Sequence, residues 1–479
     1  MTQDFWQTAL FVSWGTYVAG LAVWIILQKR SPAATVSWIL LLAWVPLLGY
    51  LIYYFFGPQR LKRFRLRRLR SRVSLAAQAD AARAREAAYE DSEPLQALAR
   101  LAHASCDNPL STAQEVSLLV DGAQTFDAIF DAIRQARRHV HAEYYIFEAD
   151  ATGTALRDLL AEKAAAGISV RLLVDALGAP LASGRFFKPL VEAGGQVAYF
   201  HETRVGRRLR PVINFRTHRK IVVCDGEVGF TGGLNITDDQ DERIDPGAYH
   251  DVHLRLKGGA VRWLQMVFLE DWVYTTGRGE NVEFSPDDHE DYMPHSEPGS
   301  RFVQILHSGP NDPREAIYRV QVAAIHNATE RVWLTTPYFV PPQPAMMSLT
   351  SAAMRGVDVR ILVPRRSDSR IVTAAARSYF DELIEAGVKV WEYPDRMLHS
   401  KTLLVDAECS FVGTANFDNR SFRLNYEVCA LVYGPELAKD LAEQFEKDLA
   451  SATLVAESRP TSIFQRLFEA CCRLFSPIL

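Results

Sequence analysis

The sequence predicts an α/β protein in which two duplicated halves, each with a central mixed sheet flanked by helices, follow an N-terminal transmembrane hairpin of two helices. Three observations support this prediction. Two long uncharged apolar stretches lie near the N-terminus, a motif of five special residues occurs twice at the same spacing, and strand-like apolar runs alternate with helical stretches around both copies. The 479 residues are enough for two or three domains, and the net charge of -4 indicates no class of partner.

The N-terminal apolar stretches are residues 5–27 and 36–56, and neither contains a charged side chain. Each is long enough to cross a hydrocarbon core of about 30 Å. The opening "MTQD" lacks the basic start of a cleavable signal peptide, and neither stretch has the polar face of a helix from a soluble core. We therefore expect a transmembrane hairpin over residues 1–58.

Positive charge is distributed unevenly around this hairpin. Lys29 and Arg30 lie between the stretches, whereas eight cations follow the second one: Arg60, Lys62, Arg63, Arg65, Arg67, Arg68, Arg70 and Arg72. Because flanking cations favour the cytoplasm, we expect a multi-pass protein of the bacterial cytoplasmic (inner) membrane with the remaining chain on the cytoplasmic side. The basic run either only sets this topology or also attracts anionic headgroups, and the two roles are compatible.

The rest of the chain divides by composition into five segments. They are a basic and helical linker (59–115), a first half (116–282), an acidic linker (283–300), a second half (301–456) and an amphipathic tail (457–479). The halves share further patterns, such as "AAAGISVRLLVD" and "AMRGVDVRILVP". The tail is expected either to dock on the domain or to lie on the membrane surface. The six cysteines have neither disulfide nor metal-ligand spacing.

The repeated motif combines cationic, amide and glycine positions. It reads His218, Lys220, Asp225, Gly232 and Asn235 in the first copy, and His399, Lys401, Asp406, Gly413 and Asn416 in the second. Side chains alternate along a strand, so each histidine and the lysine two residues later point to the same face. The lysines offer positive charge and the asparagines offer amide donors, which together suit the non-bridging oxygens of a phosphate.

Two copies facing one another explain the duplication. Displacement at a phosphodiester requires a nucleophile on one side of the phosphorus and a proton donor on the other. One imidazole can attack to form a phosphohistidine, and the second can protonate the leaving alkoxide and later deprotonate the acceptor. No carboxylate cluster of Mg²⁺ or Zn²⁺ type is visible, so we expect no metal and no cofactor. The alternative, that these residues only decorate β-hairpins, is disfavoured by their matched recurrence.

At these residues the sequence resembles the phospholipase D superfamily, whose signature is His-x-Lys-x4-Asp followed by Gly-Gly/Ser/Thr-x-Asn. Within it, the whole chain is similar to the bacterial cardiolipin synthases, through its apolar N-terminus, "NFRTHRKIVVCDGEVGFTGGLNI", "NFDNRSFRLNYE" and the closing "LFSPIL". The resemblance implies that His218 is the nucleophile and His399 the acid/base. It also implies that the carboxylates of Asp251 and Glu427 orient the two histidines.

Two details complete the comparison with the family motif. Asp225 and Asp406 are the acidic residues of the catalytic signature, and we expect them to fix the hairpin turn and the lysine. Thr414 stands where the signature has a second glycine, serine or threonine.

A short insertion before His218 is rich in arginine: Arg204, Arg207, Arg208, Arg210 and Arg216. A solvated loop and contact with a lipid phosphate explain these arginines equally well.

The reaction implied by the resemblance joins two phosphatidylglycerols into cardiolipin and releases glycerol. One phosphodiester replaces another, so no ATP site is needed, and the chain contains no GxxxxGK[ST]. The basic run is interleaved with only one aromatic residue, Phe64, so the expected partners are a phospholipid substrate and an anionic membrane surface, with no nucleic acid. The alternatives are a phospholipase D-type hydrolase releasing phosphatidic acid, a membrane-tethered nuclease, and a non-catalytic phosphate-binding protein.

Overall fold

The protein consists of two units in the computed structural model. One unit is Met1–Lys62 with Thr203–Asn214, and the other is Arg63–Glu202 with Phe215–Leu479. The structure describes residues 3–27, 32–56, 93–201, 214–277, 292–294, 296–394, 396–456, 459 and 462–479. The basic run, most of the acidic linker and the arginines of the insertion other than Arg216 lie outside the described residues.

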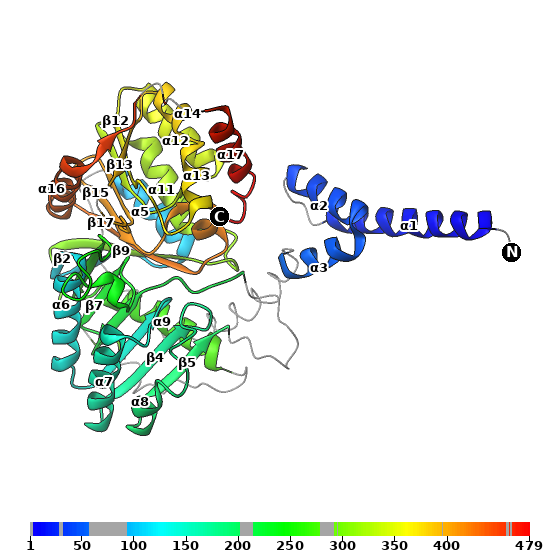
Figure 1. Ribbon diagram of the computed structural model, residues 1–479. Helices are drawn as coiled ribbons and strands as arrows, with labels where there is room; N and C mark the ends of the chain where they lie inside the picture. The colour runs from blue at the N-terminus through cyan, green and yellow to red at the C-terminus, as the bar shows by residue number, and fades with distance from the viewer. Residues whose placement is uncertain are drawn as a thin grey trace. The chain divides into compact units, whose positions relative to one another are not determined.

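The described residues of the N-terminal unit form the helices α1 (Gln3–Ile26), α2 (Pro32–Trp44) and α3 (Pro46–Phe56), which are drawn in blue in Figure 1. Residues Phe5–Ile26 of α1 are long and apolar enough to cross a membrane, with a mean hydropathy of 1.8. The second apolar stretch differs from the expectation, because it is two helices of 13 and 11 residues. Pro46 has no N–H to continue the helix and its ring crowds the preceding turn. Each piece is shorter than the roughly 20 residues that a membrane crossing requires.

The two halves of the second unit have the same sequence of strands. The first contains β2 (Glu115–Val120), α6 (Asp121–Gln135), β3 (His139–Tyr144), α7 (Ala151–Ala165), β4 (Ser169–Asp175), α8 (Lys188–Glu192), β5 (Gln196–Phe200), β6 (Ile221–Cys224), β7 (Val228–Gly232), the short helix η2 (Asp238–Gln240), β8 (Val252–Lys257) and α9 (Val261–Thr276). Its seven-stranded sheet has the order β2-β8-β7-β6-β3-β4-β5.

The second half repeats this plan. It contains β9 (Arg301–Ser308), α11 (Ala316–Asn327), β10 (Arg331–Thr335), β11 (Phe339–Val340), α12 (Gln343–Met354), β12 (Asp358–Pro364), α13 (Arg370–Arg377), α14 (Phe380–Glu385), β13 (Lys389–Tyr393), β14 (Thr402–Val405), β15 (Cys409–Gly413), β16 (Phe417–Asp418), α15 (Asn419–Arg423), β17 (Glu427–Tyr433) and α16 (Pro435–Ser451). Its sheet has the matching order β9-β17-β15-β14-β10-β12-β13, extended by β1 (Ser111–Ala113) and β18 (Thr453–Leu454). The predicted α/β class and its duplication are confirmed.

Both sheets are mixed in the same way. In the first, β3, β4 and β5 are parallel, whereas β6, β7 and β8 join by antiparallel pairing. The parallel strands need crossover helices, and α7 and α8 supply them. Asp150 begins α7 as its N-cap, because its carboxylate accepts a hydrogen bond of 2.8 Å from the backbone N–H of Gly153.

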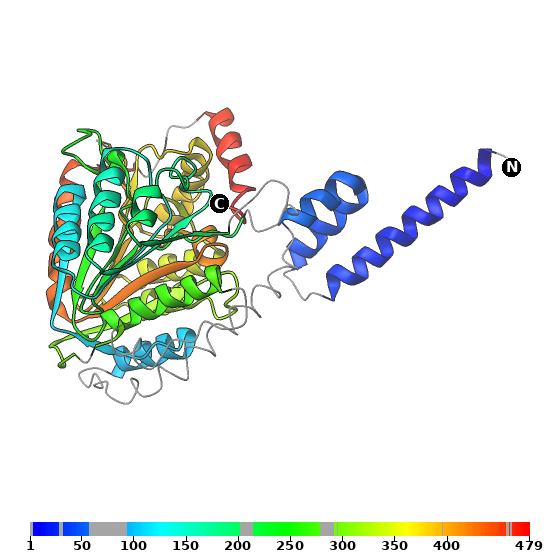
Figure 2. The ribbon, with the colours of Figure 1, turned by 90° about the horizontal axis from the view of Figure 1, so that it is seen from below.

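A shared hydrophobic core joins the two sheets. It combines Leu254 and Leu256 of β8 with Val428 and Ala430 of β17, and α9 and α16 contribute further apolar side chains. Figures 1 and 2 show the halves packed against each other, with helices covering the outer faces. Because this close-packed core contains strands from both halves, it holds the two sheets in a fixed position relative to each other.

Two terminal segments pack on the second half. Helix α5 (Glu93–Cys106) precedes the first half in sequence, yet Asn108, just after it, donates a 2.8 Å hydrogen bond to the carbonyl of Ile305 in β9. At the other end, α17 (Ile463–Arg473) packs beside α13. The tail therefore docks on the domain, which was one of the two alternatives for it.

Candidate active site

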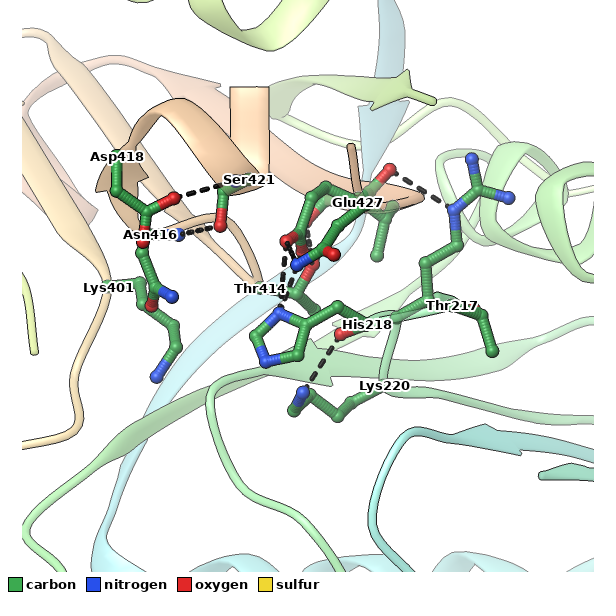
Figure 3. A network of polar contacts seen from close by, with 12 residues as sticks. Thr217, His218, Lys220, Lys401, Thr414, Asn416, Asp418, Ser421 and Glu427 are labelled. Atoms are coloured by element: carbon green, nitrogen blue, oxygen red, sulfur yellow. Dashed lines mark hydrogen bonds and ion pairs between the residues drawn. The ribbon is translucent and has the colours of Figure 1, made fainter. Parts of the chain in front are cut away.

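Each histidine–lysine pair lies directly before a central strand. His218 and Lys220 precede β6, and His399 and Lys401 precede β14. In both pairs the lysine ammonium donates a hydrogen bond to the carbonyl of its own histidine, at 2.9 Å for Lys220. All four residues are more than nine-tenths buried. The repeated motif thus forms one polar centre inside the protein, part of which is drawn in Figure 3.

The two halves exchange backbone hydrogen bonds at this centre. The N–H of His218 donates to the carbonyl of Tyr426 at 2.9 Å, and the N–H of His399 donates to the carbonyl of His250 at 2.7 Å. Parallel bridges of Thr217 with Tyr426 and of His250 with Leu398 accompany these bonds. The backbone of each histidine is therefore held by a residue of the other half, just before β17 for His218 and just before β8 for His399.

The carboxylates are exchanged in the same way. Nδ1 of His218 lies 3.0 and 3.1 Å from the two carboxylate oxygens of Glu427, and Nδ1 of His399 lies 2.6 Å from Oδ2 of Asp251. Both carboxylates are completely buried. An acceptor at Nδ1 places the imidazole proton on that nitrogen, so Nε2 carries the free lone pair.

The difference between the two motifs at the position after the glycine has a steric cause. A Cβ on Gly233 would lie 2.0 Å from Oδ1 of Asp251, so no side chain fits there. In the second copy the position is Thr414, whose hydroxyl donates to Oε2 of Glu427 at 2.5 Å. Asn425 donates to the other oxygen at 3.2 Å. The longer glutamate of this copy is thus held by two side chains that the aspartate copy lacks.

The backbone of each motif asparagine is held by a nearby polar side chain. The backbone N–H of Asn235 donates to the side chain of Gln240, and that of Asn416 donates to Ser421 Oγ at 3.1 Å. Asn416 lies next to Lys401 in Figure 3, and its amide oxygen has no hydrogen-bond partner among the described residues. The side-chain amide of Gln240 also reaches Nδ1 of His399 at 3.4 Å.

The two motif aspartates lie at the other ends of β6 and β14. The carboxylate of Asp225 accepts hydrogen bonds of 2.8 to 2.9 Å from the backbone N–H groups of residues 137–139. Asp406 binds the backbone N–H groups of residues 329–331 in the same way. Both adopt positive φ, 56° and 54°, at the hairpin turn. The structure therefore groups the histidines, lysines, asparagines and exchanged carboxylates, and leaves Asp225 and Asp406 outside this group.

Burial changes the proton affinities of the centre. It lowers the pKa of His218 to about 4 and that of His399 to about 3, against the opposing effect of their carboxylates. The lysine of the same motif, and to a smaller extent the lysine of the other half, also disfavour the cationic form of each histidine. Both imidazoles are thus neutral at pH 7 in the free protein, as a nucleophile must be.

The lysines are similarly affected. Burial and the charge of Lys401 lower the pKa of Lys220 to about 7, and burial lowers that of Lys401 to about 8. Burial removes the water that would otherwise solvate both ammonium groups, so an added negative charge favours their charged forms. An anionic phosphate between them would supply it, which makes the centre suited to a phosphodiester.

Several residues of the centre were not identified from the sequence. Arg219 is 1% exposed and lies between the halves. Its guanidinium bonds to the Glu427 carbonyl at 3.1 Å, to the Ser308 carbonyl at 3.2 Å and to the carboxylate of Asp271. Arg216, assigned to the insertion, is also buried and pairs with Asp175 at 3.3 Å. The only signal for Arg219 in the sequence was a charged residue between two motif residues, His218 and Lys220.

Among the described residues, no group of three His, Cys, Asp or Glu side chains could hold a metal ion. The expectation of metal independence stays a prediction.

Two mixed sheets of matching strand order that share one histidine–lysine centre define a protein of the phospholipase D superfamily. The phosphatidylserine synthase of Haemophilus influenzae Rd KW20 has the same fold, with a TM-score of 0.60 at 17% identity, covering 80% of this chain and 100% of that one. The family model "Cardiolipin synthase, PLD-like domain" matches residues 129–243 and 322–449, and "Phospholipase_D-nuclease N-terminal" matches residues 18–58.

The chain belongs to the cardiolipin synthase family, whose members are phosphatidyltransferase enzymes. The cardiolipin synthase of Geobacillus sp. (strain WCH70) is 38% identical over 100% of this chain and 96% of its own length. Cardiolipin synthase 1 of Bacillus anthracis is 37% identical over 98% of this chain and 94% of its own length. The match at residues 18–58 and the apolar helix α1 indicate association with a membrane.

Proposed function

We propose that the protein transfers the phosphatidyl group of one phosphatidylglycerol to a second, through a phosphohistidine, giving cardiolipin and glycerol. The observation that carries the proposal is the exchanged pairing of His218 with Glu427 and of His399 with Asp251. Each pair leaves one Nε2 available for attack or proton transfer. The names of the relatives support this substrate.

The first step forms the covalent intermediate. Nε2 of His218 attacks the phosphorus, a P–N bond forms, and the P–O bond to the glycerol headgroup breaks. His399, protonated once the phosphate anion adds negative charge beside it, gives its proton to the leaving glycerol oxygen. Glu427 accepts the Nδ1 proton of His218 in a hydrogen bond and so stabilises the cationic phosphohistidine.

The second step reverses these roles with a new alcohol. The now neutral His399 takes the proton from a hydroxyl of the second phosphatidylglycerol, whose oxygen attacks phosphorus. The P–N bond breaks, His218 returns to neutral imidazole, and cardiolipin leaves. Because the same residue is acid in one step and base in the next, its carboxylate partner must support both states, and Asp251 at 2.6 Å does so.

Lys220, Lys401, Asn235 and Asn416 bind the non-bridging oxygens. The two ammonium groups oppose the charge that develops on those oxygens, and the amides add hydrogen bonds in a water-poor site. The lowered lysine pKa values in the free protein rise when the phosphate arrives, since the anion favours the charged form. Because these side chains neutralise the phosphate charge without a metal ion, the protein should keep full activity in excess EDTA.

The test is to incubate the purified protein with phosphatidylglycerol alone and identify products by mass. Cardiolipin with an equal amount of glycerol supports the proposal. Phosphatidic acid as the main product in a bilayer would instead identify a phospholipase D-type hydrolase, which uses water in the second step. Cleavage of nucleic acid without lipid turnover would identify a nuclease.

We further propose that the protein is multi-pass, with its catalytic unit in the cytoplasm, because eight cations follow residue 58 and only Lys29 and Arg30 lie between the apolar stretches. Reporter fusions after Leu75 should be cytoplasmic and fusions after Arg30 external. The bend at Pro46 allows another path, in which residues 32–56 enter and leave the same face. A cytoplasmic reporter at both positions would establish that path and refute two crossings.

A further inference from the structure

Helix α17 docks through its polar face. Glu469 and Cys472 are the buried residues of the helix, and the carboxylate of Glu469 bonds to the guanidinium of Arg459 at 3.1 Å. Just after the helix, the hydroxyl of Ser476 lies 2.9 Å from that of Tyr379, and both side chains are buried. On this side of the helix an ion pair and a hydroxyl contact accompany Cys472, which joins the hydrophobic core of the second half.

The opposite side of the helix is apolar and exposed. Six large side chains there are between 52% and 80% exposed: Ile463, Phe464, Leu467, Phe468, Leu474 and Phe475. With 3.6 residues per turn, the four within α17 lie on one face about 140° wide. A surface helix of a soluble protein normally turns its apolar face to the core. α17 has the reverse orientation.

The charged residues of α17 lie away from its apolar face. Its only acidic residue is Glu469, which is 4% exposed and paired with Arg459. Its other charged residues are Arg466 and Arg473. Arg473 lies on the docked side, where its guanidinium stacks on the Tyr379 ring at 4.1 Å and reaches Glu382 at 3.5 Å. The outward face is therefore aromatic and aliphatic and carries no carboxylate, as the lipid-facing side of an interfacial helix does.

The segment after α17 is bonded to the active-site framework. The backbone N–H of Arg420 donates to the Leu479 carbonyl at 2.8 Å, and its guanidinium reaches the Ile478 carbonyl at 3.3 Å. The carbonyl of Arg420 in turn accepts from the N–H of Asn425, whose side chain holds Glu427. Figure 1 shows α17 on the second half with the C-terminus beside it.

We propose that the outward face of α17 lies in the headgroup region of an anionic phospholipid bilayer and places the catalytic unit against its lipid supply. The proposal rests on the proposed function, because a lipid whose phosphate must reach a buried centre while its acyl chains stay in the bilayer requires that centre to lie at the surface. An exposed apolar face of this size is otherwise unfavourable in water. Its connection to the active-site framework favours the bilayer over a second copy of the chain as the occupant.

Cys471 provides a direct probe. It is the exposed cysteine on the outward face, and the other five cysteines are buried. The full chain, labelled there with an environment-sensitive fluorophore, is reconstituted in phosphatidylglycerol vesicles. We expect the fluorescence of the label to be protected from quenching by iodide in the water and to be quenched by spin-labelled lipid. The matched control carries the same label on Val191→Cys, a half-exposed position of α8 in the other half, in a Cys471→Ser chain. This label should be quenched by iodide and not by spin-labelled lipid.

Activity provides a second readout. Replacing Phe464, Leu467 and Phe468 by Ser should raise KM for phosphatidylglycerol in vesicles roughly tenfold, equivalent to about 1.4 kcal/mol, and leave turnover of a short-chain, monomeric phosphatidylglycerol unchanged. The control replaces Val191 and Met354, which are 53% and 74% exposed, by Ser and should change neither. Loss of turnover on the short-chain substrate as well would show a structural role and overturn the proposal.

The fluorescence outcomes separate the possible occupants. A Cys471 label that iodide still quenches in vesicles overturns the proposal, because the face is then in water. A label protected from both iodide and spin-labelled lipid also overturns it, because protein covers the face. If the enzyme turns over no phosphatidylglycerol in any form, the proposed function fails, while the label experiment still reports whether α17 meets lipid.

Discussion

His218 and Glu427 belong to opposite halves of the chain, yet the imidazole Nδ1 lies 3.0 Å from the carboxylate. The reverse pair, His399 with Asp251, is at 2.6 Å. Neither half therefore contains a complete histidine–carboxylate pair. The backbone bonds from His218 to Tyr426 and from His399 to His250 make the exchange rigid. Each half supplies the carboxylate that orients the histidine of the other half.

The first prediction concerns Glu427→Gln. An amide can donate to Nδ1 and so favour the wrong tautomer, with the proton on Nε2, where the lone pair is needed. We expect kcat to fall about 10³- to 10⁴-fold, as for the comparable carboxylate change in a Ser-His-Asp triad. Steady-state rates with phosphatidylglycerol in mixed micelles measure this effect. Asp225→Asn is the control, since its carboxylate binds only backbone N–H groups at the remote turn, and it should affect stability more than kcat. A loss below tenfold for Glu427→Gln would refute the tautomer argument.

The second prediction concerns the two imidazoles. His218→Asn and His399→Asn should each remove nearly all turnover without unfolding, because the rings act as one relay. A phosphatidyl-enzyme should accumulate on His218 when His399 is replaced, since loss of the base slows the second step. Mass spectrometry of peptides labelled from radioactive lipid locates it. Label on His399 in the His218→Asn protein would reverse the assignment.

The third prediction is the pH profile of kcat/KM, which reports the free enzyme. His218 must be neutral to attack, so activity should rise as pH increases through its pKa of about 4. Lys220 and Lys401 must be charged to bind phosphate, so activity should fall as pH increases through about 7 to 8. The observed values belong to the coupled group. Arginine in Lys220→Arg cannot lose its proton in this range, so the falling limb should move up from about 7 towards the pKa of about 8 of Lys401. A flat profile between pH 6.5 and 9 would contradict the assignment of the lysines.

The sequence was sufficient to predict the duplication and the histidine–lysine pairs, because fixed spacing along a strand determines which side chains share a face. It could not predict which carboxylate meets which histidine. Asp251 and Glu427 each follow their own motif in the chain, and only the packing of the two sheets around one core exchanges them. The role of Arg219 was hidden for the same reason, since its partners Asp271 and Ser308 are distant in sequence.

Two local features also required the structure. The apolar stretch 36–56 predicts one helix by composition, whereas the missing N–H of Pro46 divides it. The periodicity of residues 463–475 predicts an amphipathic helix, but not which face docks. Here the ion pair of Glu469 with Arg459 fixes the polar side inward.

The last prediction concerns a buried charge cluster next to the active site. The imidazole of His250 lies between two carboxylates, 2.6 Å from Asp121 and 3.0 Å from Asp448, which come from different halves. Arg396 binds the other oxygen of Asp121, and the ring of Tyr393 stacks on His250 at 5.6 Å. Burial alone would lower the pKa of His250, but the hydrogen bonds and charges of the two carboxylates raise it from 6.5 to about 9.

A raised pKa in the folded state means that folding favours the protonated imidazole. The stabilisation is fully present below pH 6.5, the pKa in the unfolded chain, and is lost as pH rises through 9. A shift of this size corresponds to about 3 kcal/mol. We therefore expect the free energy of unfolding, measured by denaturant titration in detergent, to fall by about that amount more between pH 6.5 and 10 in the natural protein than in His250→Gln. Taking the difference between the two proteins cancels the titration of Lys220 and Lys401. An equal pH dependence in both would show that His250 is neutral in the folded state. Because the backbone of His250 also positions His399, the same loss should loosen the contact between the halves before it unfolds either one.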